Sequence, residues 1–353
     1  MLRCLTAGES HGQAQIAILD GMPAGLKVVL AIINQELKRR QSGFGRGKRM
    51  EIEKDRVQII SGLKKGITLG SPIALVIQNK DFSIERLPKV ICPRPGHADL
   101  AGLLKYGFTD IRAALERASA RSTAATVGIG AVCKIFLDEF KIKISSRVLS
   151  IGGATSAQAR LDKIRAAINK KDTAGGIFEM VAKHVPVGLG SYVQPDRRLD
   201  GRIAQAIMSI PGIKAVEIGL GFGYAEKFGS QVHDAIYYSK SKGLPVGRQG
   251  YFRKTNNAGG IEGGISNGED IVIRACMKPI ATLLHPLDSV NIITKKPSQA
   301  AVERADICVV EAAGVVAESA VAFVLADAFL EKFGSDSILD IKKAYQQYQE
   351  RIK

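Results

Sequence analysis

The sequence predicts an α+β fold in which antiparallel sheets enclose buried helices, that is, a β-α-β sandwich. Many short runs alternate apolar and polar residues, as half-buried antiparallel strands do. Two longer segments are predicted as helices, one rich in Ala and one apolar on almost every face, which is typical of a helix in a protein interior. Strands and helices do not alternate regularly, so a parallel α/β sheet is not favoured.

The predicted elements run along the whole chain. The strands are residues 15–20, 56–61, 73–78, 142–151, 177–183, 215–221, 270–277 and 289–293. The first helix covers residues 109–140 and, if unbroken, would span about 45 Å at about 1.5 Å per residue. The second covers residues 311–333, and residues 343–353 form an amphipathic tail on the surface.

Size and composition indicate an ordinary globular protein. The 353 residues are 46% hydrophobic, enough for a substantial core, and no Pro/Ser linker divides the chain, so we expect one domain over residues 1–353. No stretch of 18 uncharged apolar residues occurs, and we expect no membrane partner. Five scattered cysteines without a C-x-x-C pair indicate free thiols in a reducing cytoplasm, not disulfides or a metal site.

The formal net charge of +16 points to an anionic partner or to a solvated basic surface. Nucleic-acid binding usually combines basic residues with aromatic stacking platforms, but the chain has no Trp and only 6% aromatics. Its arginines lie instead in Gly- and Ser-rich stretches, a setting suited to phosphate and carboxylate ligands. A small polyanion is therefore favoured, and no nucleic acid is expected.

Two stretches present histidines in tight loops. Residues 8–12 read Gly-Glu-Ser-His-Gly, and residues 94–99 read Arg-Pro-Gly-His-Ala-Asp. Each histidine, His11 or His97, could be an exposed acid–base group, although a structural histidine is the simpler interpretation of either motif alone. Asp99 stands two residues after His97 and could orient its ring.

Three further stretches gather cations and glycines. Residues 39–49 hold five cations and three glycines, which suits a loop that closes over an anion. Arg117 and Arg121 are one helical turn apart, so we expect them to share a buried face and to need an anion, from a ligand or from a protein carboxylate. Residues 255–268 hold five glycines that could cradle phosphate or a ring edge, or form only a long turn.

In this order, the stretches resemble the chorismate synthase family across nearly the whole chain. The resemblance rests on residues 5–12, 40–49, 94–99, 119–121, 186–190, 255–268 and 304–306. It implies a sandwich of antiparallel sheets, a homotetramer, and an anti 1,4-elimination of phosphate from 5-enolpyruvylshikimate 3-phosphate to give chorismate. It also implies reduced FMN as cofactor without net redox change, with NADPH as a candidate reductant.

The resemblance also assigns roles to individual residues. His11 corresponds to the acid near the departing phosphate, and His97 to the group that protonates the reduced flavin. Asp306 corresponds to the carboxylate that helps to remove the C6 proton through flavin N5, with Ser10 and Ser119 supporting this relay. The cationic shell around substrate and flavin comprises Arg40, Arg46, Arg49, Arg121 and Arg304. The flavin-contacting residues are Arg117, Ala118, Ser119, Gly263, Lys278, Pro279, Ile280, Ala281, Thr282 and Arg304.

The chain departs from the family pattern in several places. Ala305 stands where His or Ser is usual, and Ser122 where an acidic residue is common. Pro211 and Gly212 replace a segment that brings flavin contacts, residues 242–250 look like an insertion, and the region 160–175 is short. None of these changes removes a proposed catalytic residue.

Three alternatives remain open at this level. A basic RNA-binding protein would be colourless and would bind nucleic acid in a salt-sensitive way. A flavoprotein oxidoreductase would consume NAD(P)H stoichiometrically with its substrate. An inactive relative would fold but not turn over, for which Ala305 is the motivating departure.

Overall fold

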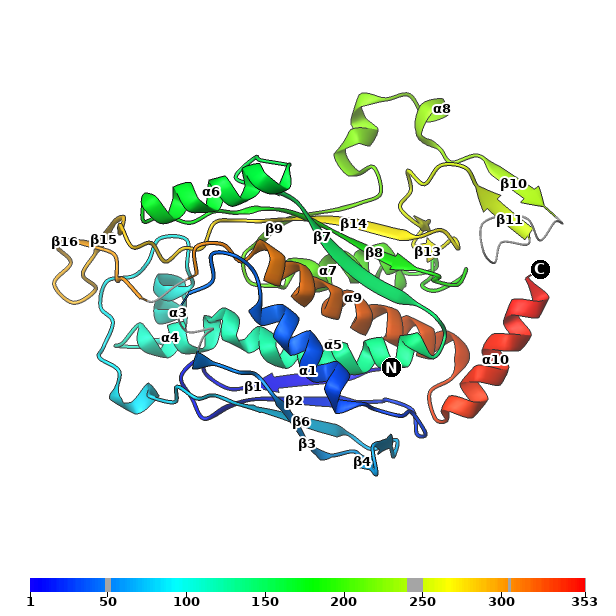
Figure 1. Ribbon diagram of the computed structural model, residues 1–353, viewed down its shortest axis with the longest axis horizontal. Coiled ribbons are helices and arrows are strands. Elements are labelled where there is room, and N and C mark those ends of the chain that lie inside the picture. The colour runs from blue at the N-terminus through cyan, green and yellow to red at the C-terminus, as the bar shows by residue number, and fades with distance from the viewer. Residues whose placement is uncertain (48–51, 240–249, 304–305, 353) are drawn as a thin grey trace.

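The structure, a computed structural model, describes residues 1–47, 52–239, 250–303 and 306–352. Two four-stranded antiparallel sheets form its outer layers and helices lie between them, which confirms the predicted α+β sandwich (Figure 1). The first sheet has the order β1-β2-β6-β3, with β1 Arg3–Ala7, β2 Ala14–Asp20, β3 Val57–Ser61 and β6 Ile73–Gln78. The second has the order β7-β8-β14-β9, with β7 Lys143–Ile151, β8 Gly176–Lys183, β9 Ile213–Ile218 and β14 Ile271–Met277.

Alternation of side chains explains how these strands form the layers. In β2, Ala17 and Leu19 are buried against the helices, whereas Ile16 and Ile18 face outward. The register pairs Leu5 with Ile18 and Ile18 with Ala74, so the outer face of the sheet is apolar as well as the inner one. A one-residue slip would move Ala17 and Leu19 out of the core, which favours this register.

The remaining elements extend from these layers. The helices are α1 Leu30–Gln41, α3 Asp99–Tyr106, α4 Arg112–Ala118, α5 Thr123–Asp138, α6 Ala157–Asn169, α7 Leu199–Met208, α8 Gly229–Val232, α9 Val310–Phe333 and α10 Ile338–Arg351. The short strands are β4 Leu63–Lys64, β5 Ile67–Thr68, β10 Ile236–Ser239, β11 Gly250–Arg253, β12 Ile261–Glu262, β13 Ile265–Ser266, β15 Asp288–Val290 and β16 Pro297–Gln299. The hairpin of β10 and β11 stands away from the layers (Figure 1).

The centre of the molecule is the pair α5 and α9. They approach closely at Gly130, where an added Cβ would lie 2.2 Å from the Ser319 Cβ, so only glycine fits there. The stretches Arg112–Asp138 and Val310–Phe333 are apolar and long enough to cross a membrane, but most of each is buried inside the molecule. Helices buried in this way are core helices, as predicted for residues 311–333.

A buried carboxylate joins the layers around this pair. Glu318 of α9 is fully buried and accepts hydrogen bonds from Arg39 of α1 (2.7 Å), Lys134 of α5 (2.5 Å) and Ser146 of β7 (2.6 Å). Burial alone would raise the pKa of Glu318, but these donors lower it below its usual value. The ionised carboxylate therefore holds three elements around α9.

The structure corrects three predictions about the elements. The helix predicted over residues 109–140 is broken, because Ser119 is extended (ψ 141°) and separates α4 from α5. The strand predicted over 289–293 ends at Val290. Helix α1 was missed because two of its four buried residues, Glu36 and Arg40, are charged, which hides its apolar period.

Candidate active site

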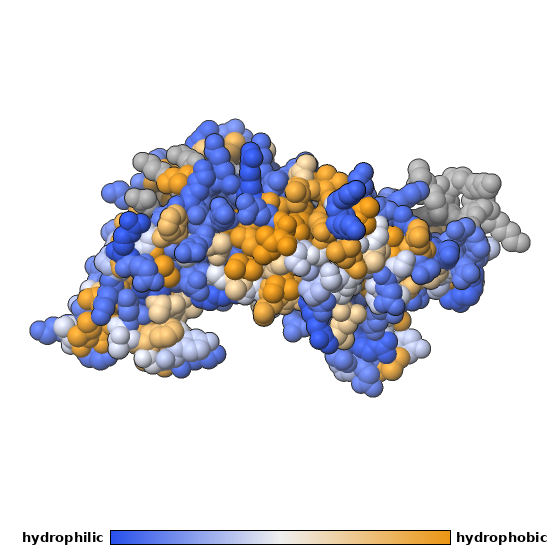
Figure 2. Space-filling view, turned by 90° about the horizontal axis from the view of Figure 1, so that it is seen from below, coloured by the Kyte–Doolittle hydropathy of each residue, from blue (hydrophilic) through white to orange (hydrophobic). Residues whose placement is uncertain are grey.

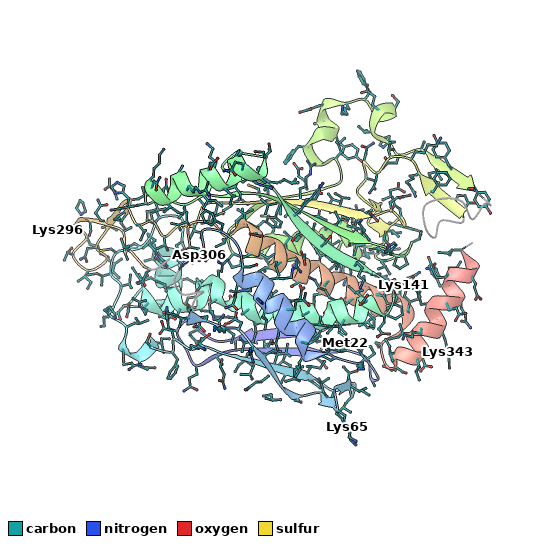
Figure 3. The ribbon with its side chains drawn as sticks, viewed as in Figure 1. Met22, Lys65, Lys141, Lys296, Asp306 and Lys343 are labelled. Atoms are coloured by element: carbon teal, nitrogen blue, oxygen red, sulfur yellow. The ribbon has the colours of Figure 1, made fainter. Side chains whose placement is uncertain are left out.

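Most of the segments singled out in the sequence, though not residues 255–268, meet at the end of the molecule that carries α3 and α4, opposite α10 (Figure 1). Asp306, labelled in Figure 3, lies at this end. Backbone hydrogen bonds join the segments, from Ile307 N to Gly45 O (2.8 Å) and from Ala301 N to Cys92 O (3.0 Å). Four loops and the α4–α5 junction therefore build one site region.

The interruption at Ser119 shapes this region. Ser119 caps the short 3-10 turn Ala120–Ser122 by accepting from Arg121 N, and its hydroxyl donates to Ser10 Oγ at 3.1 Å. The Ser10 backbone N–H in turn donates to Glu116 O at 2.9 Å. The end of α4 is thus bound to the loop that carries His11.

His11 is held by a carboxylate from α4. Its ring Nδ1 lies 2.9 Å from Glu116 Oε1, and its backbone N–H donates to Glu116 Oε2 at 2.7 Å. The ring Nε2 lies 4.0 Å from Asp81 Oδ2. Burial alone would raise the pKa of Glu116, but the hydrogen bonds from His11 and the charge of Arg112 lower it, so the carboxylate is ionised.

His97 is held by its near neighbour, as its motif predicted. Its Nδ1 lies 2.5 Å from Asp99 Oδ1, and Asp99 is fully buried. Arg94 donates to both carboxylate oxygens (2.8 and 2.9 Å) and to Thr282 Oγ1 (2.7 Å). Although burial raises the pKa of Asp99, the hydrogen bonds from Arg94 and His97 lower it strongly overall.

Two buried arginines share one carboxylate. Arg121 donates to both oxygens of Asp55 (2.7 and 2.8 Å), and Arg40 Nη1 lies 3.4 Å from Asp55 Oδ2. Burial lowers the pKa of Arg40 to about 10, with Arg121 and Arg46 adding to the effect and Asp55 and Asp306 opposing it. Arg121 and Arg46 are therefore each close enough to Arg40 to repel its charge.

Arg117 does not share this environment, which corrects the expectation that it lies buried on one face with Arg121. The extended Ser119 turns the chain, so Arg117 is exposed and donates to the backbone oxygens of Thr6 (3.0 Å) and Gly8 (3.3 Å). The buried Arg121 finds its anion in the protein, because Asp55 supplies it. Ala118 lies half-buried between them.

Asp306 meets the loop after α1. Its Oδ1 accepts from Gly47 N at 2.5 Å and lies 3.5 Å from Arg46 Nε. Arg46 is therefore beside the carboxylate that the resemblance assigns to proton removal. The predicted residues Arg49, Arg304 and Ala305 lie outside the described residues, as does most of the proposed insertion 242–250.

The segment 278–282 packs against the His97 loop. The Lys278 ammonium donates to Gly96 O, and Thr282 accepts from Arg94. Ile280 O accepts from Thr173 (2.8 Å), which fixes the backbone between Pro279 and Ala281. Burial lowers the pKa of Lys278, and Lys214 lowers it further.

Gly263 lies far from these groups in the same chain. It occupies the turn between β12 and β13, next to the beginning of β14, whereas Lys278 follows the end of that strand. The seven residues of β14 span about 23 Å at about 3.3 Å per residue. Gly263 has a φ of 59°, a backbone conformation that favours glycine, and a Cβ added to it would have open space around it.

Three guanidinium nitrogens in this region are buried without a hydrogen-bond partner. Within the described chain these are Arg46 Nε, Arg112 Nη1 and Arg121 Nη2. Each of them lies within 4.0 Å of a protein carboxylate, of Asp306, Glu116 and Glu53 respectively, so the protein already balances part of their charge. The geometry therefore offers two carboxylate-held imidazoles and a cluster of buried arginines.

Comparisons with known proteins bear on this geometry. The family model described as "Chorismate synthase" matches residues 2–330. The chorismate synthase of Thermoanaerobacter pseudethanolicus is 53% identical over 355 residues, covering 100% of this chain and 99% of the relative. That of Geobacter metallireducens is 49% identical and covers 100% of both chains. A solved structure described as "Crystal Structure of Chorismate Synthase" is 44% identical, with a TM-score of 0.80 over 99% of this chain and 98% of that one.

The chain belongs to the chorismate synthase family. The recognised family and the enzyme class, a lyase, are thereby confirmed, and so is the role in the shikimate pathway that makes aromatic amino acids. The match of the solved chorismate synthase over almost the whole length also confirms the fold class.

Several residues that build the candidate site of this chorismate synthase family member were not predicted from the sequence. Glu116 and Asp55 are buried carboxylates that hold His11 and Arg121, and Arg94 holds Asp99. Glu116 stands one residue before Arg117, and nothing local marks it as a partner of a histidine 105 residues away. Arg94 lay inside a quoted motif, and its spacing to Asp99 could have suggested the pair.

Proposed function

We propose that this chain converts 5-enolpyruvylshikimate 3-phosphate to chorismate and phosphate by an anti 1,4-elimination. The single observation that supports it best is the junction of α4 and α5, which brings Ser119 to Ser10 and Glu116 to His11 while directing Arg121 inward. The substrate loses a phosphate at C3 and a proton at C6, and a new carbon–carbon double bond forms. Both the proton and the leaving group need placed acid–base groups.

The cluster of arginines suits this substrate. The substrate carries two carboxylates and a phosphate, and Arg40, Arg46 and Arg121 supply positive charge to match. The repulsion of Arg40 by Arg46 and Arg121 is reduced when an anion binds. The same field stabilises the phosphate as it leaves. Arg49 is proposed to join this group.

Each catalytic side chain has a proposed task. His11 donates a proton to the departing phosphate, with Ser10 and Ser119 holding its loop in place. Asp306 supplies the carboxylate that assists removal of the C6 proton, and Arg46 Nε lies 3.5 Å from it. His97, held by Asp99, would keep a proton available to the cofactor when the cofactor is bound.

The proposed cofactor is reduced FMN, which supplies an electron transiently and recovers it, so the reaction has no net redox change. The chain's residues fit such a group, since Lys278 supplies a cation beside the His97 loop, and burial lowers its pKa, an effect that an anion would oppose. The residues proposed to hold it are Arg117, Ala118, Ser119, Lys278, Pro279, Ile280, Ala281, Thr282, Arg304 and, from its distant turn, Gly263. NADPH is proposed as a source of reducing equivalents.

A direct assay tests this function. Anaerobic incubation of the protein with dithionite-reduced FMN and 5-enolpyruvylshikimate 3-phosphate should release phosphate and chorismate in equal amounts. Oxidised FMN without dithionite is the control and should give no product. In a parallel reaction with NADPH in place of dithionite, consumption of NADPH in proportion to product would indicate an oxidoreductase instead. Absence of product from folded protein would contradict the proposal.

We further propose a cytoplasmic homotetramer with a small-molecule substrate and without nucleic-acid or membrane partners. The first sheet supports assembly, because its strands carry the exposed apolar residues Leu5, Ile16, Ile18 and Ile60, of which Leu5 and Ile60 are 70% and 69% exposed. Figure 2 shows an apolar area on the surface of the molecule seen from below. Uncovered apolar faces of this kind favour contact with another copy.

Sedimentation equilibrium tests the assembly. The wild-type chain should sediment as four copies, and Leu5→Lys with Ile18→Lys should shift it to smaller species with unchanged helical circular dichroism. Leu339→Lys is the matched control, since Leu339 is 67% exposed on α10, outside that face. A monomeric wild type would contradict the proposal.

A further inference from the structure

The carboxylate of Glu116 contacts both the ring and the backbone of His11. One oxygen lies 2.9 Å from the ring Nδ1, and the other accepts the His11 backbone N–H at 2.7 Å. The side chain of Glu116 is only 1% exposed, and that of His11 is 17% exposed. A buried carboxylate that holds both the ring and the backbone of one histidine fixes that residue's position and orientation.

This contact also decides which ring nitrogen carries the proton. An ionised carboxylate can only accept, so Nδ1 must be the donor in the 2.9 Å contact. A neutral imidazole with a proton on Nδ1 has its lone pair on Nε2. Any proton that the ring gains or gives up is therefore exchanged at Nε2, the nitrogen that faces the one-third exposed Asp81 at 4.0 Å.

The carboxylate of Glu116 is itself held in place by Arg112. Arg112 Nη1 lies 3.8 Å from Glu116 Oε1, and Arg112 Nη2 donates to Glu303 at 2.9 Å. Arg112 Nε donates to Pro88 O at 3.2 Å. The guanidinium is thus fixed by two other segments, and Glu116 cannot rotate away from His11 without leaving its positive neighbour.

We propose that Glu116 is a positioning residue for His11, which holds the imidazole as the Nδ1–H tautomer and directs Nε2 to the substrate. Its importance for turnover rests on the proposed proton donation by His11. The tautomer itself does not depend on that function, so the two can be tested separately.

Nitrogen-15 NMR of the unliganded protein tests the tautomer. With labelled histidine, the neutral ring of His11 should show a protonated Nδ1 and a bare Nε2, and His11→Ala identifies its signals among the five histidines. In Glu116→Gln the amide oxygen should accept the backbone N–H while its NH₂ donates to Nδ1, which moves the ring to the Nε2–H tautomer. A wild-type ring already protonated at Nε2 would overturn the proposal, whether or not the variant folds.

Steady-state kinetics tests the positioning. Glu116→Gln should lower kcat about ten- to a hundredfold with a smaller change in KM, as loss of an outer partner commonly does. Glu116→Asp keeps the charge and should recover part of kcat. Glu139→Gln removes a carboxylate from an ion pair with Lys342 at the far end of α5 and should leave kcat unchanged.

The outcomes separate the two proposals. A tautomer change together with the loss of kcat supports positioning by Glu116. An unchanged kcat in a folded Glu116→Gln overturns it, even if the tautomer moves. If the wild type makes no chorismate but its His11 is protonated at Nδ1, the proposed function fails while the tautomer assignment stands.

Discussion

The two histidine centres of the site reach the same arrangement by different routes. In each, a buried carboxylate holds the ring Nδ1, and an arginine stands behind the carboxylate. The partner of His97 is two residues away, whereas the partner of His11 is 105 residues away on another element. The first centre is therefore built by one loop, and the second exists only when α4 has packed against the N-terminal loop.

Removal of either ring should have the largest effect. His11→Ala and His97→Ala should each lower turnover about a hundred- to ten-thousandfold, because general acid–base groups contribute on this scale. The measurement is single-turnover formation of chorismate by protein with unchanged circular dichroism. Near-full activity in one variant would show that its histidine has no role in proton transfer. The two histidine centres would then not be equivalent.

The carboxylate of the His97 centre should matter most for stability. Asp99→Asn leaves the buried Arg94 without its ionised partner, which commonly costs about 3–5 kcal/mol. Glu116→Gln should cost less, since Arg112 keeps Glu303. Urea unfolding of both variants measures the difference, and an equal or reversed order would contradict this reading of the two centres.

The Asp99 carboxylate should also make the free energy of unfolding depend on pH in acid, and this effect should be smaller. Burial raises the pKa of Asp99, but Arg94 and His97 lower it below its ordinary value of 3.8. A carboxyl with a lowered folded pKa stabilises the fold above its unfolded pKa, and this contribution is lost as the pH falls through the folded value. The free energy of unfolding should thus decrease below about pH 4.

The matched variants for this acid effect are Asp99→Asn and Asp340→Asn. The first should flatten the dependence of the unfolding free energy on pH, whereas the second should not, since the Asp340 side chain is 77% exposed. Urea midpoints at about pH 6 and about pH 3 give the comparison. Parallel profiles for wild type and Asp99→Asn would be the contrary result.

The smallest effect is expected at the link between α4 and the His11 loop. Ser119→Ala removes the cap of the 3-10 turn and the hydrogen bond to Ser10. Loss of such a cap typically costs about 1 kcal/mol. Thermal unfolding measures it, and His97 should keep its NMR signals because no contact joins it to Ser119. Broad changes at His97 would show that the centres are not independent.

The same contrast explains what the sequence could predict. Alternating runs predicted most strands, and the apolar run predicted α9, because these patterns are local. The role of Asp99 beside His97 was also local. The contacts of Glu116 and Asp55 depend on tertiary packing, and the spacing of Arg117 and Arg121 misled because it assumed a continuous helix. The roles assigned to His11, His97 and Asp306 came from the family resemblance, not from spacing.

The interruption at Ser119 makes the length of this segment more critical than its composition. The extended Ser119 and the 3-10 turn Ala120–Ser122 set the position of α4 relative to α5, so one residue inserted there would displace α4 against α5. Because α5 is fixed where Gly130 meets Ser319, α4 would have to move, and Glu116 would leave His11. Single-residue insertions should therefore be tolerated in the hairpin of β15 and β16 but excluded here, so relatives that keep this site should also keep this spacing.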